Sequence, residues 1–503
     1  MITVNLPASL CHSTHRPRRV GRMQCLCVAV LLAATASAFD AAVAAPQGTL
    51  VFNNVNTIDA VNGLQSGMAV VVQGNRITRV AAASELKLAE NATIIDGTRK
   101  YLIPGLWDAH VHLSFEPDIT PAMFKLFLVN GITSIRDTGG QLELIVPWRE
   151  RAREDPQNTP RVMLAGPLLD GKPLVYDGSS PGRPELGVAI GSVAEAERLV
   201  DEMATAGVDL IKSYEMLSPE VFRALIDRAR SKGLQVTGHV PLSMDVISAS
   251  NAGLRSMEHL RNLEMSCSAY SEQLLKDRRH LLQEGANDRG GVLRSRIHQA
   301  QRTRAVNTQD EATRKRVLNT LAENGTWQIP TLTVVIGHRL HTQPAWRDTF
   351  KYLPESAHQR WIGKALRSSA TPRSSARNAY AQWAYDMIGH LSKAGVGIMA
   401  GTDCPIVFLT PGFSLHEELG LLVKGGLTPL QALESATLKP AQYFKMDHEL
   451  GTIAENMLAD LILLDANPLD DIRNTTRVNS VVRDGRLHDR KALDQMLKEL
   501  EAE

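Results

Sequence analysis

The stretch Ile103-Pro-Gly-Leu-Trp-Asp-Ala-His-Val-His112 decides the fold of this chain. Its apolar residues after Gly105 predict a short buried strand that ends in two histidines spaced by one residue. Alternate residues of a strand point to the same side, so His110 and His112 can both reach one metal ion. The end of a buried strand is also where barrel enzymes keep their reactive groups.

Short apolar runs alternate with helical patterns from Pro104 to about Phe444. Two helices are expected at Pro219–Ser231 and Pro429–Thr437, the second with Thr428 as its N-cap. Alternation over this length predicts the α/β class and a (β/α)8 TIM barrel. The eight predicted strands are 106–110, 132–136, 161–165, 209–212, 235–239, 255–259, 327–330 and 396–400.

Short strand patterns also flank this region at both ends of the chain. They cannot close a core alone, so the two termini are predicted to form one small discontinuous β-sandwich. The patterns are Thr49–Phe52, Met68–Val72, Arg76–Val80 and Ala92–Ile95 on one side, and Ala459–Leu464 and Asn479–Arg483 on the other. The predicted organisation is 46–103 for the first part of the sandwich, 104–445 for the barrel and 446–503 for the second part.

The barrel region is longer than the ~250 residues typical of such a fold. The surplus lies at about 261–325 and 338–390, and both segments follow predicted strands. We expect solvated helices that cover the site. The alternative, an inert surface excursion, stays open at this point.

The first 45 residues have the pattern of a secretory signal peptide. Four arginines precede the apolar run Cys25–Ala34, which ends in Ala36-Ser-Ala38. The run is shorter than the ~20 apolar residues that a membrane span needs. The sequence therefore predicts a periplasmic or secreted protein with no membrane insertion of the mature chain; the alternative is a buried N-terminal helix. The arginines are Arg16, Arg18, Arg19 and Arg22.

The composition of the 503 residues is that of an ordinary globular protein, with 44% hydrophobic and 22% charged residues. Lys and Arg number 55 against 54 Asp and Glu, so the chain lacks the basic field that nucleic-acid binding requires. Outside the predicted leader only Cys267 and Cys404 remain, which excludes a disulfide framework. Two isolated thiols are favoured over a single bridge. Homo-oligomer formation is left open.

Three more residues that can bind metal end predicted strands, namely His239, His259 and Asp403. Lys212 also ends a predicted strand. A lysine buried there is costly as a cation, so burial lowers the pKa of its amine. Such a lysine suits either a Schiff base or an amine carboxylated by CO₂ that bridges two metals. The surrounding histidines favour the second role over the first, and a lysine that merely reaches solvent is the third alternative.

The order Pro-Gly-x-x-Asp-x-His-x-His, Ile-Lys, Gly-His, Glu-His and Gly-Thr-Asp closely resembles the amidohydrolase superfamily. Within it, the chain looks most like the imidazolonepropionase-like branch that includes metal-dependent Xaa-Pro dipeptidases (prolidases). The resemblance implies a binuclear site with two divalent ions, for which zinc suits the nitrogen and oxygen ligands. It assigns His110, His112 and Asp403 to one ion, His239 and His259 to the other, and N6-carboxylysine at Lys212 to the bridge.

The same resemblance implies a mechanism. A metal-activated hydroxide attacks the carbonyl, and Asp403 passes the proton to the leaving nitrogen. Tyr214 is similar to a family tyrosine near the substrate carboxylate or the oxyanion; packing in the barrel is the alternative. The predicted function is an exported amidohydrolase that cleaves the C–N bond of a small-molecule amide, either a dipeptide or an N-acyl amino acid.

Two alternatives to this function stay open. The first is a lactonase or cyclic-amide hydrolase that uses the same ligands, and the second is a non-catalytic periplasmic metal-binding protein. A zincin site at His416-Glu-Glu is excluded, because the second histidine of that motif would fall at Gly420. We expect His416 to lie on a helix surface with a packing role.

Overall fold

The computed structural model describes residues 48–87, 90–180, 183–369 and 374–502. The predicted signal peptide at 1–45 lies outside the described residues. Among the residues that are described, no helix combines the length and the apolar character needed to cross a membrane.

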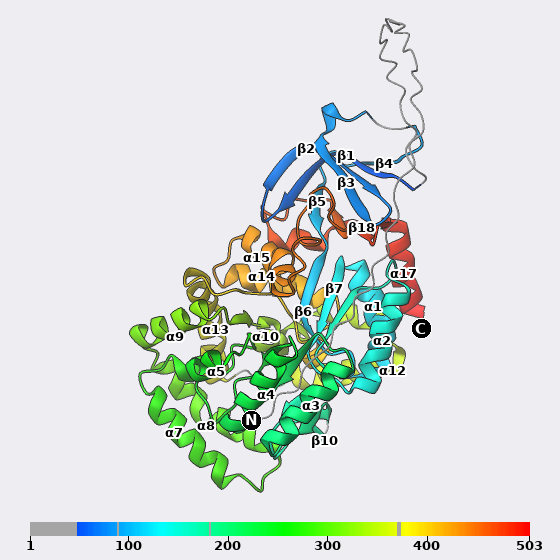
Figure 1. Cartoon of the computed structure of the whole chain (residues 1–503). Coiled ribbons are helices and arrows are strands. Elements are labelled where there is room, and N and C mark those ends of the chain that lie inside the picture. The colour runs from blue at the N-terminus through cyan, green and yellow to red at the C-terminus, as the bar shows by residue number, and fades with distance from the viewer. Residues whose placement is uncertain (1–47, 88–89, 181–182, 370–373, 503) are drawn as a thin grey trace, which may run out of the picture. The chain divides into compact units, whose positions relative to one another are not determined.

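Parallel strands dominate the middle of the chain (Figure 1). One sheet consists of β6 (Leu106–Val111), β7 (Ile132–Asp137) and β8 (Arg161–Leu164), all parallel. A second sheet has the order β12-β9-β13-β14-β15-β16 and is also parallel. Its strands are β9 (Leu168–Asp170), β12 (Gly187–Ala189), β13 (Leu210–Ser213), β14 (Gln235–Gly238), β15 (Ser256–Glu258) and β16 (Trp327–Ile329).

The eighth predicted strand, 396–400, is not a strand in the structure. Ile398 makes an isolated parallel bridge to Gln328 of β16 instead, and Cys404, four residues beyond this segment, makes one to Val111 of β6. The backbone N–H of Ala400 donates to Ser435 in the following helical region, which takes this residue out of a regular ladder. The segment nevertheless links the two parallel sheets. Strands β9 and β12 and the hairpin β10 (Asp177–Ser180)–β11 (Arg183–Glu185) were not predicted.

Both ends of the described chain contribute to one eight-stranded sheet with the order β19-β18-β17-β5-β1-β2-β3, in which β4 pairs with β1. Strand β17 runs antiparallel to β5, so the C-terminal segment is hydrogen-bonded to the N-terminal one, as predicted. The sandwich itself stays a prediction. The strands are β1 (Leu50–Asp59), β2 (Gly63–Gln73), β3 (Arg76–Ala82), β4 (Thr93–Asp96), β5 (Tyr101–Pro104), β17 (Leu461–Leu464), β18 (Val478–Arg483) and β19 (Arg486–His488).

Helices follow most of the parallel strands. The first are α1 (Thr120–Val129), α2 (Leu142–Glu154), α3 (Val193–Thr205), α4 (Pro219–Ser231) and α5 (Val246–Ala252). Helix α4 has the predicted bounds, because Ser218 caps the N–H of Val221 and Pro219 occupies the first turn. The last are α14 (Phe413–Lys424), α15 (Pro429–Ser435), α16 (Leu438–Tyr443) and α17 (Arg490–Ala502). Thr428 caps α15, as expected, and forms a capping box with Gln431, although the helix ends before Thr437.

The two surplus segments are helical. The first contains α6 (Leu263–Ser266), α7 (Ser271–Glu284), α8 (Gly290–Asn307) and α9 (Glu311–Glu323). The second region contains α10 (Leu332–Leu340), α11 (Pro344–Arg347), α12 (Glu355–Ser369) and α13 (Ser375–Lys393). Helix α10 begins directly after β16, so this excursion starts earlier than the predicted residue 338.

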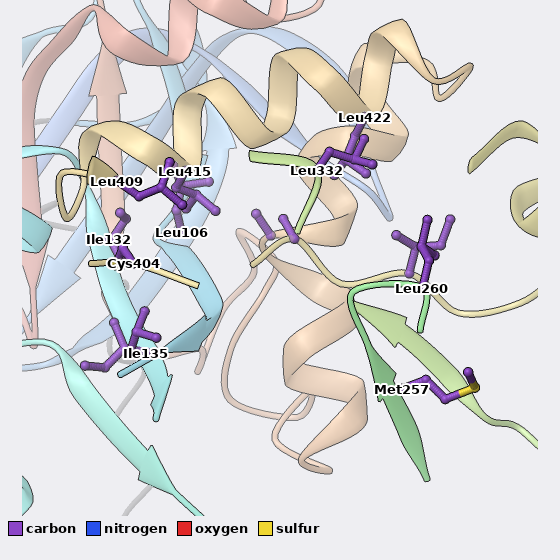
Figure 2. Close-up of a cluster of buried hydrophobic side chains, with 14 of the residues drawn as sticks. Leu106, Ile132, Ile135, Met257, Leu260, Leu332, Cys404, Leu409, Leu415 and Leu422 are labelled. Atoms are coloured by element: carbon purple, nitrogen blue, oxygen red, sulfur yellow. The ribbon is translucent and has the colours of Figure 1, made fainter. Parts of the chain in front are cut away.

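Apolar side chains between the strands and α14 form a continuous core (Figure 2). Leu106 of β6 and Ile132 of β7 lie near Leu415 of α14, and all three are fully buried. Cys267 and Cys404 are both buried and free, which confirms two isolated thiols. His416 is also buried, with its Nδ1 atom 3.0 Å from Thr475 Oγ1, so the expected surface position is wrong while the packing role holds. The side chain faces the core because Leu415 and Leu419 place this side of α14 inward.

Candidate metal centre and active site

His110, His112 and Asp403 converge on one point. The Nε2 atoms of both histidines lie 3.1 Å from Oδ1 of Asp403, and all three side chains are buried. Two of these atoms, His110 Nε2 and Asp403 Oδ1, are buried without a hydrogen-bond partner. Buried polar atoms are normally satisfied, so this convergence fits a ligand that the atoms share. The trio is therefore a group that could hold a metal ion.

Four histidines of the site are each held through Nδ1, which leaves Nε2 as the nitrogen for a metal. The Nδ1 contacts are His110 to Glu258 Oε2 at 2.6 Å, His112 to the Gly139 carbonyl at 2.9 Å, His239 to Glu215 Oε1 at 2.5 Å and His259 to Thr331 Oγ1 at 2.6 Å. Metal-ligating histidines commonly donate their other ring N–H to such an acceptor, which fixes the tautomer and the ring. His239 Nε2 is likewise buried and unpartnered.

The remaining predicted residues line one small cavity of ≈ 100 Å³ together with His112 and Asp403. They are Lys212, Tyr214, His239 and His259, and all four are buried. The ring of Tyr214 stacks on that of His239 with centroids 4.3 Å apart. The structure thus brings together every residue that the sequence nominated, at the carboxyl ends of β6, β13, β14 and β15 and in the segment after 400.

Local backbone features place these side chains. Asp108 accepts hydrogen bonds from Thr402 N at 3.0 Å and Thr402 Oγ1 at 2.7 Å, so the β6 motif holds the Gly-Thr-Asp segment in position. Gly238 has a φ of +145°, and a Cβ there would lie 2.1 Å from the Ser213 carbonyl oxygen. Only glycine fits this approach of β14 to β13 just before His239.

Burial and neighbouring charges shift the pKa values of the site. Burial lowers the pKa of Lys212 to about 8, against the opposing attraction of Glu258. Burial disfavours the charged form of Asp403, but His259 and His110 outweigh it and hold the pKa of that carboxyl well below its usual range. Burial also lowers the pKa of His239 to about 3. The cluster therefore contains an ionised Asp403 and a neutral His239, which are the forms that bind cations.

The donor set fits divalent metal ions. Imidazole nitrogens and a carboxylate, with no thiolate at the described site, suit zinc, manganese or iron. The family model for the amidohydrolase family matches residues 101–488, which include every one of these side chains. The chain belongs to the amidohydrolase family. This agrees with the resemblance drawn from the motif order and with an enzyme that hydrolyses carbon–nitrogen bonds.

Several known proteins resemble this amidohydrolase over part or most of its length. An ochratoxinase from Aspergillus niger is 40% identical over 83 residues, which cover 16% of this chain and 16% of that protein, so the match spans only a small part of the relative's length. The solved structure of a Xaa-Pro dipeptidase with bound methionine aligns with a TM-score of 0.62 and 19% identity over 88% of this chain and 100% of that chain. Bottromycin amidohydrolase aligns with a TM-score of 0.66 and 23% identity over 91% of each chain. The structural likenesses show a shared fold, and this fold includes prolidases.

Sequence reasoning missed the residues that contact the candidate ligands of this amidohydrolase. Glu258 lies behind His110 and also accepts hydrogen bonds from Arg136 at 2.9 Å and from Thr237. Glu215 lies behind His239. Glu215 directly follows Tyr214, and Glu258 directly precedes His259. Their positions next to predicted site residues could therefore have pointed to them.

Two arginines of the cavity were also missed, Arg261 after β15 and Arg294 on α8. Arg294 belongs to the first surplus segment. Because its side chain lines the cavity, the alternative of an inert surface excursion is wrong for this helix.

Proposed function

We propose that this chain is an exported, binuclear, metal-dependent amidohydrolase that cleaves the C–N bond of a small-molecule amide, namely a dipeptide or an N-acyl amino acid. One observation carries the proposal. His110, His112 and Asp403 converge, and His239, His259 and Lys212 line the same cavity, with the Nδ1 atom of each histidine already engaged. The prolidase-like fold supports the same reaction class.

The proposed ligands divide into two sets. His110, His112 and Asp403 would hold one ion, and His239 and His259 the other. Lys212 would bridge them after its amine nitrogen bonds to the carbon of CO₂ and releases a proton, which gives an anionic carbamate. When bound, zinc ions lower the pKa of water and polarise a carbonyl oxygen, which is the chemistry that amide hydrolysis needs.

The chain's own residues would direct the proton and the substrate. Asp403 is ionised and faces the cavity, so it would accept a proton at a carboxylate oxygen and then donate it to the leaving nitrogen. Tyr214 lines the cavity beside His239, where its hydroxyl would donate to an oxygen of the substrate. Glu258 and Glu215 would keep the rings of His110 and His239 in a fixed orientation.

The proposal extends to the architecture and the location. The two parallel sheets and the segment from 396 to 404 would form a (β/α)8 barrel over 104–445, with the terminal strands of 46–103 and 446–503 as a separate small β domain. Reactive side chains at the carboxyl ends of the strands support a barrel. The proposed periplasmic or secreted location rests on the arginine-rich leader and its apolar run.

The test combines metal content and hydrolysis by the purified mature protein. Elemental analysis should give two divalent ions per chain, and a panel of dipeptides, N-acyl amino acids, cyclic amides and lactones should show turnover of the first two classes. One ion per chain with activity only on cyclic amides or lactones would contradict both the binuclear site and the substrate class. Bound metal without turnover of any member would favour a metal-binding protein.

A further inference from the structure

Two arginines line the cavity on the side of His239 and Tyr214. Arg294 projects from α8, and its Nε atom lies 2.9 Å from Oε2 of Glu215. Arg261 follows β15, and its Nε atom lies 4.0 Å from Oε1 of the same carboxylate. Both side chains are largely buried, with exposures of 13% for Arg294 and 18% for Arg261.

One carboxylate serves both guanidinium groups. Glu215 is the single ion-pair partner recorded for Arg261 and Arg294 among the residues that the structure describes. The same carboxylate also contacts His239 and, at 3.5 Å from Nε2, His298. Burial lowers the pKa of His298 well below its usual range, so this ring adds no charge. Two guanidinium groups at the cavity wall therefore share one carboxylate.

The nearby carboxylate of Glu264 pairs with another arginine. Glu264 is buried behind the cavity, and its carboxylate lies 3.7 Å from Nε of Arg302. Arg278 is buried as well, and its donors go to the neutral side chains of Asn262 and Gln301. Four arginines thus surround two carboxylates, Glu215 and Glu264, while the ionised Asp403 of the same cavity belongs to the candidate metal site. The arginines are Arg261, Arg278, Arg294 and Arg302. A buried charge without a partner is costly, so this region favours an incoming anion.

We propose that Arg261 and Arg294 bind a carboxylate of the substrate and so restrict the enzyme to amides that carry a free carboxylate near the scissile bond. Arginine offers a planar fork of donors that matches a carboxylate. This inference rests on the proposed function, and it separates dipeptides and N-acyl amino acids from neutral lactones and cyclic amides.

Two other features of the cavity agree with a carboxylate subsite. Tyr176 and Tyr214 line the same wall, and no hydrogen bond of either hydroxyl is recorded within the described ranges. Both hydroxyls are thus available as donors. The apolar side chains of Leu168, Leu186 and Val334 complete the lining and would contact the carbon skeleton of the substrate. The lining therefore combines polar donors with apolar side chains.

A pair of probes without an amide bond tests this subsite independently of turnover. 4-Methylpentanoate and 4-methylpentan-1-ol differ in one terminal group, and calorimetric titration of the metal-loaded protein near pH 7 gives their affinities. We expect the carboxylate to bind at least 10-fold more tightly than the alcohol. The preference should fall on the order of 10-fold or more in Arg261→Met and in Arg294→Met, since a hydrogen bond to a charged group is lost.

Arg296→Met is the matched control. Arg296 lies on the same helix, is exposed and pairs with Asp288 at 2.8 Å, so its loss should leave the preference unchanged. Equal binding of the two probes by the wild type would overturn the proposal. A preference that survives in both Arg261→Met and Arg294→Met would also overturn it, because the carboxylate would then bind elsewhere, for example on the metal.

Hydrolysis of L-alanyl-L-proline and L-alanyl-L-prolinamide addresses the proposed function separately. We expect cleavage of the acid to require Arg261 and Arg294, through a rise in KM, while the control variant behaves as wild type. A carboxylate preference in the binding experiment without cleavage of any dipeptide or N-acyl amino acid would refute the proposed reaction and leave the subsite in place. Cleavage of the acid and its amide at equal kcat/KM would refute the subsite and leave the reaction in place.

Discussion

The Oε1 atom of Glu215 lies 2.5 Å from Nδ1 of His239, and the carboxylate is almost fully buried. Its other oxygen lies 2.9 Å from Arg294, so one side chain joins a proposed metal ligand to the proposed carboxylate subsite. A change at Glu215 should therefore affect metal binding without removing a ligand.

We expect Glu215→Gln to lower metal affinity by 10- to 100-fold, which is the usual effect of losing the partner of a ligating histidine. Competition with a chelator measures this affinity. Glu220→Gln is the control, because Glu220 is exposed in the first turn of α4. An unchanged affinity in Glu215→Gln would show that His239 does not depend on this contact or does not bind metal.

Lys212→Ala should lose at least one metal equivalent per chain. The buried amine lies in the same cavity as His239 and His259, and its removal takes away the proposed bridge. Elemental analysis counts the ions, and intact-mass measurement of the wild type under native conditions should reveal the added CO₂. Lys276→Ala, an exposed position on α7, should retain both ions. Two ions in Lys212→Ala would rule out the carbamate bridge.

Asp403→Asn should reduce kcat by 10²- to 10⁴-fold, the usual contribution of a positioned acid or base. The amide cannot accept the proton at the site where His110 and His112 approach the carboxylate. Asp386→Asn, which is exposed on α13, should leave kcat unchanged. Steady-state rates on a cleaved dipeptide provide the comparison. Full activity of Asp403→Asn with its metal retained would refute the proton-transfer role.

The sequence predicted which residues come together, because they end buried strands. Parallel strands place their carboxyl ends at the same edge, so His110, His239 and His259 had to approach one another once the strand pattern was recognised. The prediction was weaker where pairing is irregular. Residues 396–400 are apolar enough for a strand, but the N–H of Ala400 donates to Ser435, which no local pattern reveals.

Local patterns could not reveal the contact between Glu215 and Arg294 for another reason. Arg294 is 79 positions from Glu215 in the sequence, and it lies on a helix whose charged residues look solvated when they are considered alone. Only the packing of α8 against the cavity brings the two side chains to 2.9 Å. The burial of His416 has the same origin, since α14 is covered on that side by the segment that carries Thr475.

The Asp460 carboxylate gives a test of stability away from the metal centre. It lies 3.0 Å from Arg161 of β8 and 3.0 Å from Arg483 of β18, and it is buried. It therefore connects the parallel sheet to the terminal sheet. Removal of one partner from a buried ion pair leaves uncompensated charge, so Asp460→Asn should lose about 3–5 kcal/mol of unfolding free energy at neutral pH.

The same carboxylate should contribute to acid unfolding. Burial opposes its ionisation, but Arg483 and Arg161 outweigh burial and lower the pKa of Asp460 below its ordinary value of 3.8. A lowered folded-state pKa means that the unfolded chain binds the proton more readily. The stabilisation is therefore complete above the ordinary value and is lost as the pH falls below it, toward the folded-state pKa.

Urea unfolding of wild type and Asp460→Asn at pH 7 and through the range below pH 4 measures both effects. The wild type should lose stability more steeply than the variant as the pH falls, so the two unfolding free energies should approach each other. Asp471→Asn is the control, because Asp471 forms an exposed pair with Arg473 at 2.6 Å and such pairs contribute little. A constant difference between wild type and Asp460→Asn at every pH would mean that the ionised carboxylate is not the stabilising form.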